Sequence, residues 1–85
     1  MNILIVEENL EEAQALCAML HQRGFESNHA LTVEQALISL GRTKIDAILL
    51  NAYPRHCGAG VDAFYRIQTN SAGIPIVVFI PENDQ

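Results

Sequence analysis

Three stretches of the chain are apolar almost without interruption, and a fourth is more polar. The apolar stretches are Asn2–Val6 (NILIV), Asp46–Asn51 (DAILLN) and Ile74–Ile80 (IPIVVFI). Runs of this kind, rich in β-branched residues and lacking alternation, are typical of strands buried on both faces in a parallel sheet. Phe25–Ala30 is more polar, which predicts a strand at the edge of the same sheet. Pro75 stands at the start of the last run, where its missing N–H matters least.

The segment after the first strand has the spacing of an amphipathic helix. Asn9 offers a side-chain oxygen to cap it, and Glu12 three residues later completes a capping-box pattern. Gly24 predicts the end of this helix, because glycine tolerates the left-handed conformation found after many helices. The apolar positions at helical spacing are Leu10, Ala13, Leu16, Cys17 and Leu20.

Two further helices are predicted downstream. Thr32 and Gln35 repeat the capping-box pattern, and Gly41 predicts the end of the second helix. A loop rich in glycine is expected over 52–60. The third helix then begins at Val61, and Gly73 predicts its end.

The resulting order is β-α-β-α-β-α-β over a single domain that spans residues 1–85. Each helix is a crossover between parallel strands, so the fold class is α/β with a doubly wound sheet and helices on both faces. In such folds the functional end lies beyond the carboxyl ends of the strands. This places Glu7, Glu8 and Asn51 together.

Composition narrows the possible partners. The formal net charge is −5 and the basic residues are scattered, which disfavours contact with nucleic acid or an anionic membrane. No apolar run approaches the roughly 20 residues needed to cross a bilayer, and the start does not have the pattern of a secretory signal. Two cysteines, Cys17 in the predicted core and Cys57 in the loop, indicate a reduced, cytoplasmic protein.

Four segments in this order resemble the receiver domains of two-component response regulators. They are ILIVEEN (3–9), RGFESNHALTVEQAL (23–37), DAILLN (46–51) and IPIVVFI (74–80). The resemblance implies a flavodoxin-like sheet with strand order 2-1-3-4. It also implies that the family's last strand and helix would follow Gln85, so the chain resembles a truncated receiver.

The resemblance implies a phosphorylation site that this chain has altered. Receivers are phosphorylated on an aspartate after the third strand, with Mg²⁺ bound by acids after the first, but Asn51 and the pair Glu7 and Glu8 stand there. A carboxamide is a poor nucleophile, and Mg²⁺ tolerates little departure from octahedral geometry. Ile80 replaces the hydroxyl residue that follows the phosphate, and the family's lysine would lie beyond the chain. The sequence therefore predicts a degenerate receiver, or pseudo-receiver, without enzymatic activity or cofactor.

Simpler interpretations of the same residues remain open. Glu7 and Glu8 are read as exposed acids that favour a helix start through its dipole, and a metal is a weak alternative. Asn51 either donates a hydrogen bond that locks the loop after the third strand or has drifted from a former active site. His56 and Cys57 are weak evidence for zinc without further ligands.

A sheet that ends at the fourth strand leaves an apolar edge uncovered. This predicts homodimerisation through that strand or the face beside it, with Tyr53, Ile76, Val78 and Ile80 as candidate interface residues. The function predicted is a phosphorylation-independent interaction module in two-component signalling or transcriptional regulation. One alternative is a degenerate receiver that binds Mg²⁺ or a phosphate ligand through Glu7 and Glu8. The other is a dimerisation unit for a DNA-binding domain.

Overall fold

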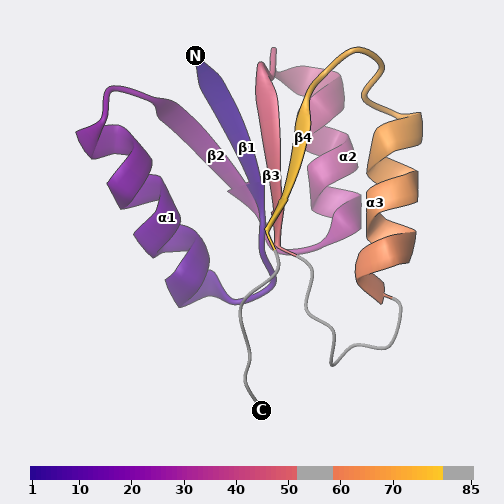
Figure 1. The fold of residues 1–85 in the computed structure, drawn as a ribbon, viewed down its shortest axis with the longest axis horizontal. Coiled ribbons are helices and arrows are strands. Elements are labelled where there is room, and N and C mark those ends of the chain that lie inside the picture. The colour runs from indigo at the N-terminus through magenta and orange to yellow at the C-terminus, as the bar shows by residue number, and fades with distance from the viewer. Residues whose placement is uncertain (52–58, 80–85) are drawn as a thin grey trace.

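The computed structural model describes residues 1–51 and 59–79, together with all their side chains except those of 59–61 and 79. Four parallel strands form one sheet in the order β2-β1-β3-β4, as predicted (Figure 1). The strands are β1 (Asn2–Val6), β2 (Glu26–Ala30), β3 (Ala47–Asn51) and β4 (Ile76–Phe79). The predicted α/β class and the edge position of the polar strand β2 are confirmed.

Helices cover the two faces of the sheet unequally. They are α1 (Leu10–Gln22), α2 (Val33–Arg42) and α3 (Ala59–Thr69). Figure 1 shows α1 alone on one face, with α2 and α3 side by side on the other. Within residues 1–51 and 59–79, no helix combines the length and the apolar character needed to cross a membrane.

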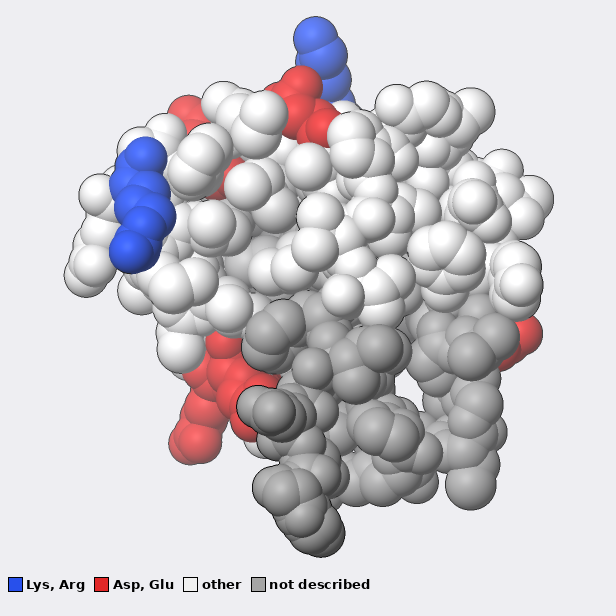
Figure 2. Space-filling view, viewed as in Figure 1, with Lys and Arg blue, Asp and Glu red and all other residues white. Residues whose placement is uncertain are grey.

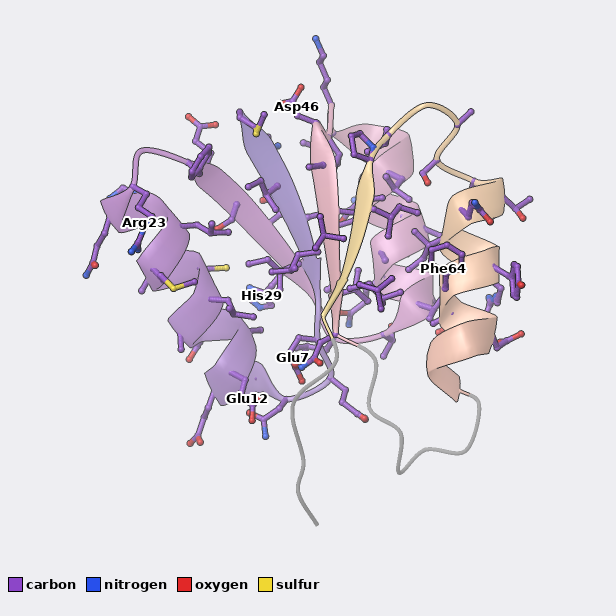
Figure 3. The ribbon with its side chains drawn as sticks, in the orientation of Figure 1. Glu7, Glu12, Arg23, His29, Asp46 and Phe64 are labelled. Carbon is purple, nitrogen blue, oxygen red and sulfur yellow. The ribbon has the colours of Figure 1, made fainter. Side chains whose placement is uncertain are left out.

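Most of the core lies between the sheet and the pair α2 and α3. Strand residues that alternate along β1 and β3 point to this side and are almost fully buried, and Ala36 and Ile67 meet them from the helices. Phe64 points from α3 toward the sheet (Figure 3). Burying one such Leu or Ile side chain contributes about 1.5–3 kcal/mol, so this layer supplies much of the folding free energy. The buried strand residues of this layer are Leu4, Val6, Ile48 and Leu50.

The opposite face is only partly covered. Ile5 and Ala13 are fully buried between β1 and α1. Because α1 packs chiefly on β2 and β1, it covers less of this face over β3 and β4. Cys17, predicted to be core, is therefore only half-buried. On β3 and β4 the residues of this face, Leu49 and Val77, pair with each other, and Val77 is 58% exposed.

The predicted N-caps are confirmed, although neither capping box is complete. The Asn9 side-chain oxygen accepts the Glu12 N–H at 3.0 Å, but the Asn9 N–H donates to Glu7 instead of Glu12. Thr32 accepts the N–H of Gln35 at 3.1 Å. The Gln35 side chain in turn accepts the N–H of residue 31, one position before the cap.

Glycine marks only one of the three predicted helix ends. At Gly24 the prediction is confirmed: its φ is +86°, and the N–H groups of Gly24 and Phe25 return to the carbonyls of His21 and Leu20. At Gly41 it is wrong, because α2 continues through Gly41 to Arg42.

The third helix also departs from its predicted bounds. It begins at Ala59 and ends at Thr69, not at Gly73. The side chains of Thr69, Asn70 and Ser71 each donate to the carbonyl four residues earlier, so they compete with the backbone and end the helix there. Gly73, with φ of +81°, serves the turn that follows.

Two glycine substitutions are expected to change stability in opposite directions. Gly24→Ala should lower the free energy of unfolding by about 1 kcal/mol, because an L-residue resists a positive φ. Gly41→Ala should raise it by about 0.5–1 kcal/mol, because Gly41 lies within α2 and a methyl group there meets no neighbour within 4 Å. Urea denaturation of both variants checks this, and a loss of stability in Gly41→Ala would contradict the helix bounds.

Candidate functional site

The carboxyl ends of β1 and β3 bring Glu7 and Asn51 together. The two strands are neighbours, and their register pairs Val6 with Leu50. The next residue of each strand is therefore adjacent to its counterpart across the sheet. Figure 3 shows Glu7 at this end of the strands, with Glu12 nearby at the start of α1. The sequence prediction that these residues meet is confirmed for Glu7 and Asn51.

Glu7 is buried, contrary to the expectation of an exposed acid. Only 1% of its surface is accessible. Its N–H donates to the Ala30 carbonyl at 3.0 Å, so the β1 ladder continues one residue past Val6. Strand alternation then puts its side chain on the same face as the fully buried Ile5. Glu8, one residue on, is exposed as expected.

Both carboxyl oxygens of Glu7 are hydrogen-bonded. Oε1 accepts from the Asn51 carboxamide Nδ2, which joins the ends of β1 and β3. Oε2 accepts the Asn9 N–H at 2.8 Å, so the same carboxyl group also holds the residue that caps α1. The predicted donor role of Asn51 is thus present, although its acceptor is Glu7. Its other polar atom, Oδ1, is buried and has no partner among the described residues.

The surroundings of Glu7 disfavour its charged form. Burial raises the pKa of Glu7 above its ordinary value of 4.5, the nearby carboxylates of Glu12 and Glu8 raise it further, and the Asn9 N–H opposes them. Within the described residues, Glu7 forms no ion pair with a Lys or Arg. The ion pair of Arg66 with Glu34, at 3.3 Å, lies elsewhere, on the exposed sides of α3 and α2.

This donor set does not fit Mg²⁺. The ion needs oxygen ligands at near-ideal octahedral positions. Both oxygens of Glu7 already accept hydrogen bonds, and Asn51 turns a nitrogen donor toward it. Within the described ranges 1–51 and 59–79, no three His, Cys, Asp or Glu side chains gather where they could hold a metal. The arrangement binds α1, β1 and β3 to one another, and the carboxamide of Asn51 is a poor nucleophile.

The two described candidate interface residues lie on the same face of the sheet but differ in burial. Ile76 is partly buried against the core under α2 and α3, whereas Val78, two residues on, is 39% exposed. Tyr53 and Ile80, like His56 and Cys57, lie outside the described residues. Sequence reasoning missed Val77, the most exposed of the described valines in β4. Side chains alternate in direction along any strand, so Val77 had to lie on the face opposite Ile76, where the register pairs it with Leu49.

No protein-family model matches the chain, and no curated protein sequence does. Solved structures do match. A response regulator receiver protein from Pseudomonas putida has a TM-score of 0.82 and 25% identity over 98% of this chain. The response regulator TrrA, in complex with the histidine kinase ThkA, has a TM-score of 0.79 and 20% identity over 98% of this chain. A fusion carrying a yeast Spc42 trimeric coiled coil has a TM-score of 0.83 and 27% identity over 99%.

These matches extend over nearly all of this chain but over less of the other proteins. The chain spans 69% of the Pseudomonas putida protein, 71% of the matched chain in the kinase complex and 56% of the fusion protein. Strand order, parallel pairing and the presence of helices on both faces agree with the expectation drawn from the sequence. The chain therefore has the fold of a response regulator receiver domain.

Proposed function

We propose that the chain is a pseudo-receiver, which acts by docking onto another protein and without phosphorylation. The observation that carries this proposal is that the side chain at the carboxyl end of β3 is already hydrogen-bonded to another side chain of the same chain. Asn51 stands at the phospho-acceptor position by resemblance, and its carboxamide is bound to the buried Glu7. A carboxamide is a poor nucleophile, and this one is already engaged in a hydrogen bond.

The rest of the phosphorylation chemistry is also altered. Both carboxyl oxygens of Glu7 accept hydrogen bonds, from Asn51 and from Asn9. They are therefore not available to a cation that would hold a phosphoryl group. Ile80, by its place in the sequence, brings no hydroxyl to the position that follows the phosphate in the family. The alternative of a retained Mg²⁺ or phosphate-ligand site therefore has no observation in its favour.

Docking is the function that remains for a receiver without covalent switching. The matched regulator TrrA was crystallised with the histidine kinase ThkA, so the fold can present a surface to a protein partner. For this chain we propose a protein partner or an output domain in two-component signalling or transcriptional regulation, in the cytoplasm. The net charge of −5 supports a protein surface and not nucleic acid.

The proposed docking surface is β4 and the face of the sheet that carries Val77. Val77 is 58% exposed on that face, Val78 is 39% exposed on the opposite face, and β4 is the last strand of the described sheet. In Figure 2 the described part of the surface between α1 and α3 is largely uncharged, and charged side chains lie toward its margins. Unpaired strand edges and apolar surface both favour association with another chain. We propose that a second copy is one such partner, which gives a homodimer.

Restoring the aspartate should not restore phosphorylation. Asn51→Asp incubated with acetyl phosphate and Mg²⁺ is expected to stay unlabelled, because Glu7 is buried against that position and Ile80 supplies no hydroxyl. Intact-mass spectrometry would detect an added phosphoryl group. The double variant Asn51→Asp/Glu7→Asp is compared with the single variant, because it also shortens the acidic side chain at residue 7. Stoichiometric labelling of the single variant would contradict the proposal.

The dimer is expected to depend on β4 and not on exposed apolar residues in general. Val77→Lys should weaken self-association by at least about tenfold, because a lysine on a buried contact must be desolvated. Ile38→Lys is the control, since Ile38 is 55% exposed on α2, away from β4. Light scattering over a range of protein concentrations measures both. Equal masses for the wild type and Val77→Lys at every concentration would exclude dimerisation through this face.

A further inference from the structure

The hydrogen bonds between Glu7 and Asn51 are incomplete if Glu7 is ionised. An ionised carboxylate only accepts, so it can pair with the Asn51 Nδ2 and with the Asn9 N–H, as the structure shows. It has no hydrogen to offer to the Asn51 Oδ1. That oxygen is buried without a donor among the described residues, which is an unfavourable state for a polar atom.

Among the described residues, a charge on Glu7 would also be poorly compensated. The group is 1% exposed, and the carboxylates of Glu8 and Glu12 face it from the turn before α1 and from its first turn. From β2 the titratable residue on this face is His29, which pairs with Ile5 and is exposed. From β3 the neighbour is the neutral Asn51, and the described side chains of β4 carry no titratable group. The Asn9 N–H favours a charge, but it is a dipole and not a cation.

One added proton would complete the hydrogen bonds. A neutral carboxyl group and a carboxamide are complementary, because the acid O–H donates to the amide oxygen while the amide N–H donates to the acid carbonyl. The hydroxyl oxygen keeps lone pairs that can still accept an N–H. Both polar atoms of Asn51 and both oxygens of Glu7 are then satisfied.

We propose that Glu7 binds a proton in the folded protein and that the resulting carboxyl O–H donates a hydrogen bond to the Asn51 carboxamide oxygen, so that a proton is the ligand held between the ends of β1 and β3. This goes beyond the docking function and does not depend on it. The proton would lie beside Asn51, the residue at the position of the phosphorylated aspartate in the family. Because the same carboxyl group holds Asn9, the proton also bears on the start of α1.

The direction of the pH effect follows from proton counting. The folded state holds a proton on Glu7 at pH values where the unfolded chain, with its ordinary pKa of 4.5, has released it. The stabilisation is therefore complete below pH 4.5 and is lost as the pH rises through the higher pKa of the folded state. Each pKa unit above 4.5 is worth tenfold in the folding equilibrium at low pH.

The direct test is a titration of the folded wild type by NMR of its glutamate carboxyl carbons. Glu7, assigned by comparison with Glu7→Gln, should titrate with a midpoint above 4.5, and the Asn51 side-chain amide should shift with the same midpoint. Millimolar Mg²⁺ should leave this midpoint unchanged. A midpoint at or below 4.5, or one that Mg²⁺ lowers, would overturn the proposal.

The second test is stability against pH. Glu7→Gln keeps an amide donor for the Asn51 Oδ1 at every pH, so its stability relative to the wild type should rise with pH through the Glu7 midpoint, by tenfold in the folding equilibrium per pKa unit. Glu11→Gln is the matched control, because it removes the same charge from an exposed position in the first turn of α1. A parallel rise in both variants would mean that net charge, and not the Asn51 pair, causes the effect.

Discussion

The central constraint of this structure is that β1 is paired on both sides and covered on both faces. Its neighbours are β2 and β3, and Leu4 and Ile5 on its opposite faces are both fully buried. The ladder runs one residue further, because the N–H of residue 7 bonds to β2. A side chain at that point has to enter the interior whatever its chemistry. Burial of an acid at residue 7 is thus a consequence of strand pairing, and the polar contacts at this end of the sheet arise from it.

The unequal helical layers have a different consequence. Two helices bury the face that carries Leu50, while one helix covers the other face only over β2 and β1. Cys17 of α1 is only half-buried and Val77 is exposed because a single helix covers this face of the sheet. Apolar side chains left at an open strand edge are a liability for a protein that stays alone. They are useful to a domain whose function is to bind another chain, and this links the incomplete layer to the proposed docking role.

Much of the fold could be predicted from the sequence because the strands are unambiguous. NILIV and AILLN are short apolar runs without alternation, which is typical of strands in a covered parallel sheet, although in the structure AILLN is fully buried on one face only. The helix ends were harder. Gly41 was predicted to end α2, but it has no positive φ and lies within the helix. A glycine in the sequence therefore does not by itself show that the backbone needs a left-handed conformation there. The end of α3 is set by three polar side chains that donate hydrogen bonds to carbonyl groups of the preceding turn. Because this effect depends on competition between side-chain and backbone donors, no single residue type in the sequence predicts it.

The site shows the limit of residue-by-residue comparison with a family. Sequence reasoning treated the carboxamide at residue 51 and the glutamate at residue 7 as separate losses, and expected an exposed acid. In the structure they are one pair. Two carboxylates in contact across adjacent strands would repel each other and would need a cation between them. Replacing one by Asn51 removes that repulsion and supplies an N–H donor, so the remaining carboxyl group can be buried with no metal. The carboxamide that is a poor nucleophile is therefore also the group that lets a buried carboxyl group pair across the ends of β1 and β3.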